Sequence, residues 1–299
     1  MPIHGLIFRR LEWHKRGVDM ANKVFLITGC SSGIGRALAV KLAKQGHRVY
    51  AGARNIYSLQ EIVHENIVPV ALDVNDKQQV MGVIEKITYE DGKLDCLINN
   101  AGYGEMGPLL EISPEKVENQ FKTNVFAPLY LVQIATPLLM KSSQASIINI
   151  GSAAGVFSTP FSGVYCASKA AFHSLSEVMR MELAPLGIHV MTVYPGAVSS
   201  SFGENASKQL MGVLAPDSLY ADVADAIEKR ATVSKHSPTT PDIFANELIE
   251  QIENSKSPKE VGIGHGSRFM RLSKRVMPIA MREWLLGRKF QLHHVSRTN

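Results

Sequence analysis

The alternation of short apolar runs with helical segments restricts the fold of this sequence more than any other feature. Beyond Lys23, segments with the apolar spacing of a helix, such as 36–45 and 80–89, separate apolar runs of strand length. Six runs are predicted to be strands: 24–28, 48–52, 68–72, 96–99, 146–150 and 189–193. Such alternation, with strands that are apolar almost throughout, is typical of a parallel sheet covered on both faces. The sequence therefore predicts an α/β protein built on a single doubly wound parallel sheet, with helices on both faces.

Most of the chain forms one globular unit. With 299 residues, of which 45% are hydrophobic and 20% charged, the composition excludes disordered, collagen-like and disulfide-stapled proteins. We predict an N-terminal extension over 1–22, expected to be poorly ordered, a main domain over 23–265 and a basic helical extension over 266–299. The segment 234–241 is interpreted as a surface loop. Because Met20 lies just before the first strand, the sequence leaves open whether Met1 or Met20 is the start of translation.

Cysteine usage and hydropathy indicate a cytoplasmic protein. The three cysteines, Cys30, Cys96 and Cys166, fit neither a disulfide framework nor a zinc site, and we expect them to be small buried residues in a reducing compartment. The apolar stretch 125–140 is interrupted by proline and polar residues, so it is predicted to be a buried helix and not a membrane span. Residues 1–22 lack the apolar core of a secretory signal.

Both ends of the chain are basic and its body is acidic. Residues 1–23 carry five Lys and Arg against two Asp and Glu, residues 256–299 carry ten against two, and 24–255 carry 17 against 23. No zinc-finger, RNA-binding or helix-turn-helix signature accompanies the basic ends, so no nucleic-acid partner is expected. A membrane surface or a solvated tail fits them better.

The first predicted strand ends in a glycine-rich turn that leads directly into a helix. Glycines let the backbone approach a pyrophosphate, and the free N–H groups at the start of the helix attract it. The pattern over 28–35 is T-G-x-x-x-G-x-G, which alone is also compatible with an ordinary structural loop. Its place between a strand and a helix favours nucleotide binding. The residues expected to contact the nucleotide here are Gly29, Ser31, Ser32, Gly33, Ile34 and Gly35.

The end of the second strand indicates which nucleotide is bound. An acidic residue there binds the ribose 2′-hydroxyl of NAD, whereas an arginine accommodates the 2′-phosphate of NADP. This chain has Ala53 and Arg54 at the corresponding positions, with no carboxylate beside them. Arg54 is also compatible with a solvated loop cation, but the pattern favours NADP(H).

A tyrosine and a lysine four residues apart form a candidate catalytic pair. On a helix, Tyr165 and Lys169 share one face, so their polar ends can converge. A phenol, with a pKa of about 10, is a poor base near neutrality, and a neighbouring ammonium together with an oxidised nicotinamide is expected to lower that pKa. Tyr165 would then exchange a proton with a substrate oxygen. Seen alone, such a pair is more often part of a helix surface.

Taken together, these motifs resemble those of the short-chain dehydrogenase/reductase family. The similarity covers about 23–200 and includes the glycine turn, the segment 99–102, the Tyr/Lys pair and the segment 195–200. It implies a Rossmann-type fold with a helical C-terminal extension, and hydride transfer between NADP(H) and an alcohol or carbonyl. The family has Thr where this chain has Ser200, which keeps a hydroxyl.

The resemblance also implies roles for individual residues. Tyr165 would be the general acid/base, Lys169 would lower its pKa and hold the nicotinamide ribose, Ser152 would orient the substrate oxygen, and Asn124 would support a proton relay. The further cofactor-binding residues that it implies are Asp73, Val74, Asn100, Ala101, Gly102, Pro195, Gly196, Val198 and Ser200. Each has a structural alternative when seen alone: Ser152 starts a loop, Asn124 caps a buried polar site, and Asp73 belongs to a turn.

The segments after Gly196 indicate the substrate. The segment 201–212 is expected to be a loop-helix over the cofactor, and its apolar content with few charged groups predicts a small lipophilic carbonyl or alcohol, such as a steroid, retinoid or lipid. The segment 268–290 mixes apolar and cationic residues at helical spacing, and Pro278 fits the first turn of a second helix there. These helices either pack over the substrate cleft or lie on an anionic membrane, as in a peripherally associated protein.

The sequence thus predicts an NADP(H)-dependent oxidoreductase, in which carbonyl reduction is the favoured direction. The rival from another class is a catalytically idle NADP(H)-binding sensor or scaffold on the same fold. By resemblance, a homodimer or homotetramer would form through the helices that contain Asn124 and Tyr165. Packing inside one chain explains the apolar run 125–140 equally well.

Overall fold

The computed structural model describes residues 23–199, 218–231, 238–254 and 257–295 of the chain. The predicted N-terminal extension, Ser200 and the predicted apolar segment 201–212 lie outside the described residues.

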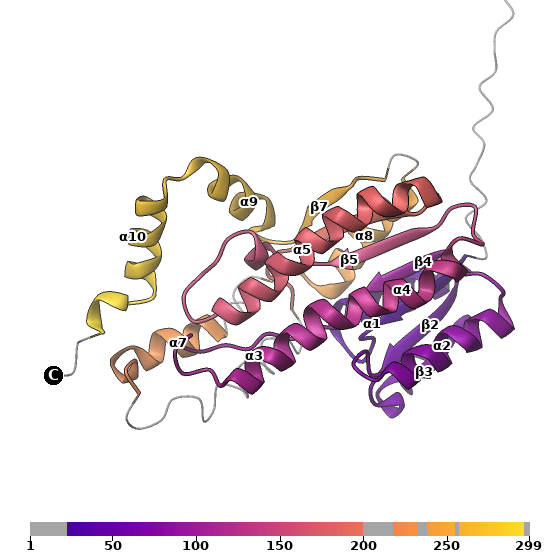
Figure 1. Cartoon of the computed structure of the whole chain (residues 1–299), viewed down its shortest axis with the longest axis horizontal. Coiled ribbons are helices and arrows are strands. Elements are labelled where there is room, and N and C mark those ends of the chain that lie inside the picture. Colours follow the sequence, from indigo (N-terminus) through magenta and orange to yellow (C-terminus); the bar gives the residue numbers. More distant parts are fainter. Residues whose placement is uncertain (1–22, 200–217, 232–237, 255–256, 296–299) are drawn as a thin grey trace, which may run out of the picture.

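A parallel sheet of seven strands in the order β3-β2-β1-β4-β5-β6-β7 forms the centre of the molecule (Figure 1). The strands are β1 (Val24–Thr28), β2 (Arg48–Ala53), β3 (Ile67–Ala71), β4 (Cys96–Asn99), β5 (Ser146–Ile150), β6 (His189–Pro195) and β7 (Glu260–Ile263). All six predicted strands are present, with ends that differ by at most two residues. The sequence analysis missed β7, because this short edge strand is mostly exposed and carries a glycine, so it lacks a continuous apolar run.

Helices cover both faces of the sheet, as the alternation of apolar runs predicts. The helices are α1 (Gly33–Lys44), α2 (Lys77–Glu90), α3 (Pro114–Phe121), α4 (Ala127–Leu139), α5 (Gly163–Leu183), α7 (Ala224–Ala231), α8 (Pro241–Glu253), α9 (Ser267–Val276) and α10 (Ile279–Lys289). Phe25 and Ile27 of β1 point to the face that α1 and α8 cover, whereas Leu26 points to the face covered by α2, α4 and α5. The sheet is therefore doubly wound.

The first two predicted helices begin earlier than their apolar spacing indicates, and a local cap explains the start of the second. Each starts three residues before its predicted start, at Gly33 and Lys77. The Asp76 carboxylate accepts hydrogen bonds from the N–H groups of Gln78 and Gln79, which satisfies donors in the first turn of α2. The apolar spacing does not report such caps, so it places the start too late.

The apolar run 125–140 forms most of α4 and packs inside the chain. Its buried residues, which include Leu131, Ala135 and Leu139, join the hydrophobic core on the α2 side of the sheet. Burial within one chain accounts for this run. Among the described residues, none of the helices combines the length and the apolarity needed to cross a bilayer. Cys30, Cys96 and Cys166 are buried and free, as predicted.

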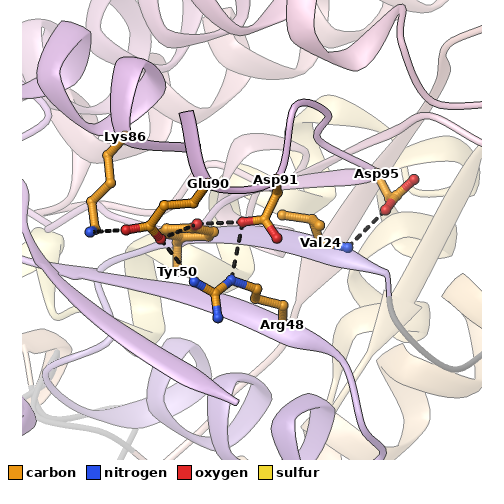
Figure 2. A network of polar contacts seen from close by, with 7 residues as sticks. All are labelled: Val24, Arg48, Tyr50, Lys86, Glu90, Asp91 and Asp95. Carbon is orange, nitrogen blue, oxygen red and sulfur yellow. Dashed lines mark hydrogen bonds and ion pairs between the residues drawn. The ribbon is translucent and has the colours of Figure 1, made fainter. Parts of the chain in front are cut away.

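A network of charged groups ties the amino-terminal ends of the strands to the helix that follows β3. Arg48 donates hydrogen bonds to Glu90 at 2.8 Å and to Asp91 at 3.1 Å, and the Tyr50 hydroxyl donates to the same two carboxylates (Figure 2). Nearby, Asp95 accepts a hydrogen bond from the backbone N–H of Val24 at 2.8 Å. These contacts lie at the amino-terminal ends of the strands. They therefore hold the sheet and α2 together on the side opposite to the carboxyl ends of the strands.

After β7, the chain forms α9 and α10 on the side of the carboxyl ends of the strands. Pro278 is the N-cap residue of α10, close to its predicted place in the first turn of a second helix. Phe290 and Leu286 pack on a separate set of buried residues, which we call the cleft-end cluster. Its buried members are Met106, Ala154, Phe161, Tyr165, Cys166, Val223, Ala226, Ile227 and Phe290. The C-terminal extension therefore packs against the main domain, one of the two arrangements that the sequence left open.

Candidate active site

The carboxyl ends of the strands border a cleft of about 1160 Å³. The chain order of the strands reverses between β1 and β4, which is the place where open α/β sheets bind ligands. Almost all described residues that the sequence predicts for the site line this cleft: Gly29, Ser31, Ser32, Gly33, Ile34, Arg54, Asp73, Val74, Asn100, Ala101, Gly102, Ser152, Tyr165, Lys169, Pro195, Gly196 and Val198. Two others, Gly35 and Asn124, lie behind its wall. The volume exceeds that of a typical pocket for one drug-sized ligand, so a dinucleotide and a second molecule have room.

The glycine turn leaves the start of α1 open toward the cleft. Gly29 and Gly33 have φ angles of +74° and +58°, which residues with side chains rarely adopt. A Cβ atom at Gly35 would lie 2.4 Å from the carbonyl oxygen of Gly29, so a larger residue would force the turn away from the helix. No side chain caps the first turn of α1. Its N–H groups and the positive end of its dipole therefore suit a pyrophosphate.

Hydrogen bonds join this turn to the end of β4. The Thr28 hydroxyl accepts hydrogen bonds from the N–H groups of Asn100 at 3.0 Å and of Ala101 at 2.9 Å. The Asn100 amide in turn donates to the carbonyl oxygens of Thr28 at 2.8 Å and Gly29 at 3.1 Å. These contacts fix the floor of the cleft on both sides of the point where the strand order reverses.

The end of β2 forms one side of the cleft, where the sequence analysis expects the adenosine ribose. Ala53 is buried, and the exposed Arg54 follows it at the wall. Asp73 and Val74 lie in the adjacent wall, where the Asp73 carboxylate accepts a hydrogen bond from the N–H of Asn75 at 2.9 Å. The Asp73 turn is thus both a structural turn and part of the cleft, so the two interpretations of this residue are compatible.

A single π-helical turn positions Asn124. The segment Lys122–Phe126 is wound as a π-helix between α3 and α4, and such turns recur at functional sites. The buried Asn124 amide donates hydrogen bonds to the carbonyl oxygen of Tyr103 at 3.0 Å and to the Ser168 hydroxyl at 3.1 Å. Asn124 is therefore held rigidly just behind Gly102, without lining the cleft itself.

Ser152 follows β5 and is fixed by α5. Its backbone N–H donates a hydrogen bond to His173 Nε2 at 3.2 Å, and its hydroxyl accepts one from the N–H of Ala154 at 3.1 Å. A Cβ atom at Gly151 or Gly155 would lie within 2.5 Å of the His173 ring, so these glycines make room for the histidine. Sequence reasoning missed His173, which holds Ser152 from the next turn of the helix that carries Lys169.

Tyr165 carries a buried phenol with a raised pKa. Burial raises the pKa of this phenol to about 12, although a hydrogen bond with Ser152 and the charge of Arg230 both act to lower it. The expected lowering of the pKa concerns the phenol beside an oxidised nicotinamide and stays a prediction for that state. In the protein alone burial dominates, and the spacing of a Tyr/Lys pair does not report how far the phenol is removed from water. At neutral pH the phenol is protonated.

Lys169 lies one helical turn from Tyr165 and is also buried. Its ammonium donates a hydrogen bond to the carbonyl oxygen of Ile150 at 2.9 Å. Burial lowers the pKa of Lys169 to about 8. A Cβ atom at Gly102 would lie 3.6 Å from this ammonium, which places Lys169 across the cleft floor from the Asn100 turn.

The end of β6 closes the cleft through contacts with β7. The N–H of Gly196 donates a hydrogen bond to the carbonyl oxygen of Ile263 at 2.8 Å, and that of Ala197 donates to His265 at 3.1 Å. A Cβ atom at Gly196 would lie 2.0 Å from the His265 carbonyl oxygen. This close approach explains the glycine, and it depends on the strand that the sequence analysis missed.

Several residues at the far end of the cleft were not predicted from the sequence. They come from distant segments, and only the fold brings them to one wall: Met106, Lys116, Arg230, Met270 and Lys289. Lys116 forms an ion pair with the buried Glu105 at 3.0 Å. The sequence gives little indication that the cations among them line a cleft, because an isolated Lys or Arg in a helical segment usually lies on the solvent-exposed face.

Sequence comparison relates the chain to known reductases. The profile of the short chain dehydrogenase family matches residues 23–210. The NADPH-dependent 1-acyldihydroxyacetone phosphate reductase of Saccharomyces cerevisiae is 30% identical over 284 residues, which cover 92% of this chain and 93% of that protein. The 3-ketodihydrosphingosine reductase of Bacteroides thetaiotaomicron is 38% identical over 189 residues, or 62% of this chain and 68% of that protein.

Structural comparison agrees with the sequence match. A short chain dehydrogenase from Burkholderia cenocepacia, solved in complex with NADP, has a TM-score of 0.70 and 25% sequence identity to this chain. The match covers 90% of this chain and 98% of that chain.

The buried Lys169 makes a testable contribution to the pH dependence of stability. Its pKa is about 8 in the folded protein and about 10.5 in the unfolded chain, so between these values the unfolded chain binds more protons. We therefore expect the unfolding free energy of the wild type, relative to that of Lys169→Met, to rise with pH between 8 and 10, by at most about 1.4 kcal/mol per pH unit.

Urea unfolding at a series of pH values measures this difference. Lys44→Met removes an exposed lysine of α1 and is the control, whose stability is expected to stay parallel to that of the wild type. Parallel curves for the wild type and Lys169→Met would show that Lys169 is not buried as an ammonium.

Proposed function

The chain belongs to the short-chain dehydrogenase/reductase family, and from this premise we propose that it reduces a lipophilic ketone or aldehyde with NADPH, using Tyr165 as the proton donor. The family match makes the chain an NAD(P)-dependent oxidoreductase that acts on alcohol or carbonyl groups. The observation that carries the proposal is the protonated Tyr165 phenol, buried at the cleft beside Ser152 and one turn from Lys169.

The protonation state of Tyr165 is the one that carbonyl reduction needs. To reduce a carbonyl, Tyr165 must give its proton to the oxygen that gains negative charge, and a buried phenol whose pKa is raised carries that proton at neutral pH. The same group would take the proton back in the reverse reaction, so the favoured direction follows from the supply of NADPH and not from this pKa.

The residues around Tyr165 have complementary tasks in this proposal. When bound, the reduced nicotinamide supplies the hydride to the carbonyl carbon. Ser152, held by His173, orients the carbonyl oxygen toward the phenol. The Lys169 ammonium adds positive charge at the cleft floor, where it stabilises the charge that develops on the oxygen. Asn124, through its hydrogen bond to Ser168, positions α5 and supports the return of a proton to Tyr165.

A catalytically idle NADP(H)-binding sensor is the alternative. The structure gives it less support, because a sensor needs the cofactor cradle but no buried phenol beside a second, apolar end of the cleft. A sensor would also not need Ser152, which is held beside the phenol by His173 and has no part in the cofactor cradle.

The apolar end of the cleft supports a lipophilic substrate. The apolar side chains of Met106, Ala154 and Met270 line the same cleft as Tyr165, so a carbonyl at the phenol hydroxyl would bring the rest of the substrate against apolar side chains. By their names, the two relatives reduce 1-acyldihydroxyacetone phosphate and 3-ketodihydrosphingosine, which agrees with this class.

The outer surface of α9 and α10 supports contact with an anionic membrane. Large apolar residues there are exposed, among them Phe269 at 71%, Leu272 at 60%, Val276 at 68% and Trp284 at 59%. Lys and Arg residues flank them along both helices. Apolar and cationic groups together suit a surface of anionic lipid, from which a lipid substrate would enter the cleft.

Replacement of Tyr165 tests the catalytic role. We expect Tyr165→Phe to lower kcat by roughly 10²–10⁴-fold, because the proton donor is lost, while NADPH binding stays close to that of the wild type. The assay follows NADPH oxidation with long-chain ketones and aldehydes. Tyr89→Phe, at an exposed tyrosine of α2, is the matched control and should retain full activity. Tight NADPH binding by the wild type without turnover of any substrate would favour the sensor.

Replacement of Arg54 tests the cofactor preference. We expect Arg54→Ala to raise KM for NADPH by about tenfold or more and to leave KM for NADH nearly unchanged, because only NADPH carries the 2′-phosphate. Lys44→Ala removes an exposed cation elsewhere on the surface and serves as the control. An equal effect on both cofactors would assign Arg54 a merely structural role.

Vesicle binding tests the membrane surface. We expect the protein to sediment with vesicles that contain phosphatidylglycerol and to be released by high salt, and the double variant F269S/W284S to bind at least tenfold more weakly. The control V63S/Y89S replaces two other exposed apolar residues. Equal binding of the two double variants would contradict the proposal.

A further inference from the structure

Arg230 is a buried arginine at the substrate end of the cleft. It lies near the end of α7, and only 8% of its surface is exposed. Its Nε donates a hydrogen bond to the Thr159 hydroxyl at 2.9 Å, and its Nη2 donates to the Ser162 hydroxyl at 3.0 Å. Both partners are neutral. In the described part of the chain, no carboxylate forms an ion pair with this guanidinium.

Arg230 lines the same cleft as Tyr165 and lies near its phenol. The two groups are close enough for the charge of Arg230 to act on the pKa of Tyr165. Glu111 holds the segment before α7 by accepting hydrogen bonds from the Ser218 hydroxyl at 2.8 Å and the Leu219 N–H at 2.9 Å. Glu111 thus holds the segment that leads into α7, and the hydroxyls of Thr159 and Ser162, just before α5, hold the guanidinium itself.

The other cations at this end of the cleft already have another role or a solvated position. Lys116 is paired with Glu105, and Lys169 donates to the carbonyl oxygen of Ile150. Lys289 is exposed at the rim, with its ammonium 5.8 Å from the centre of the Phe290 ring. Among the described residues of the cleft wall, Lys169 and Arg230 are thus both buried without a carboxylate partner, and Arg230 is the one that the proposed chemistry does not use.

A buried charge without a counter-ion is costly, and hydroxyl partners do not neutralise it. These two hydrogen bonds do fix the plane of the guanidinium. They use two of its N–H groups, and the remaining N–H groups of its planar fork are available to a ligand. A fork held in this way matches the oxygens of a phosphate or a carboxylate. If Arg230 only linked α7 to the start of α5, a neutral hydrogen-bond donor would be sufficient and no charge would be needed.

We propose that Arg230 binds an anionic group of the substrate, a phosphate or a carboxylate, a few bonds from the carbonyl that Tyr165 protonates. The inference rests on the proposed reductase function and refines its substrate class to an amphiphilic ketone, with the anion at Arg230 and the apolar chain against the cleft-lining side chains of Met106, Ala154 and Met270. The sequence analysis expected few charged groups for such an anion. It could not place Arg230, which lies 65 positions from Tyr165 in the sequence.

Matched ketones that differ in charge test this inference. The panel is palmitoyl-dihydroxyacetone phosphate, its analogue without the phosphate, and a long-chain 3-keto acid. We expect the wild type to have a kcat/KM at least tenfold higher for one of the two anionic ketones than for the neutral one, and the better anion identifies the source of the charge. In Arg230→Met this preference should be lost, mainly through KM, and in Arg230→Lys it should be retained in part.

Three controls separate this role from a structural one. Activity of Arg230→Met on the neutral ketone close to that of the wild type shows that the fold and the proposed chemistry are intact, and an unchanged KM for NADPH excludes a cofactor contact. Lys229→Met removes a cation from the exposed face of the same helix and should keep the preference of the wild type. Equal losses on neutral and anionic ketones in Arg230→Met would overturn the proposal.

Ligand binding without turnover gives a second readout, so failure of the reductase proposal is distinguishable from failure of this one. We expect hexadecyl phosphate to raise the melting temperature of the wild type in the presence of NADP, and hexadecanol to have a smaller effect. Arg230→Met should lose the difference between the two. An equal shift by hexadecyl phosphate in the wild type and in Arg230→Met would overturn the anion site, whatever the turnover results.

Discussion

The site depends first on the close contact between the glycine turn and the end of β4. The Thr28 hydroxyl and the Asn100 amide join the two strands where the chain order reverses, and Gly35 leaves no room for a Cβ atom. If this contact were wider, the start of α1 would turn away from the cleft and its N–H groups would lose the direction that a pyrophosphate needs. The other functional residues are placed relative to this floor, at the ends of β5 and β6.

The helix α5 then transmits that order to the reacting groups. Along one of its faces, Ser168 accepts a hydrogen bond from Asn124, Lys169 donates to the end of β5, and His173 accepts from the N–H of Ser152. One turn further, Ser176 accepts from Asn149 in the same strand. Successive turns of α5 are thus fixed to β5 and to the segments beside it, so Tyr165 has a fixed position before any ligand arrives.

Sequence reasoning succeeded where short-range patterns determine structure. The six strands have continuous apolar runs, and the cofactor cradle is a local turn, so both follow from neighbouring residues. The edge strand β7 was missed because its residues are half-exposed, although Gly196 owes its identity to that strand. The pKa of Tyr165 and the place of Arg230 depend on burial by segments far apart in the chain, which spacing alone does not report.

The electrostatics of the cleft follow from the same burial. Two cations, Lys169 and Arg230, are removed from water near a phenol that burial keeps protonated. The charge of Arg230 favours the phenolate, yet desolvation of the phenol outweighs it. In the proposed reduction, Lys169 would supply positive charge and Tyr165 a proton to an oxygen that becomes negative only during the reaction. Because the charge of Arg230 is present before the reaction, it would attract a substrate that already carries an anion, so the proposed chemistry and the proposed specificity would depend on two different buried cations.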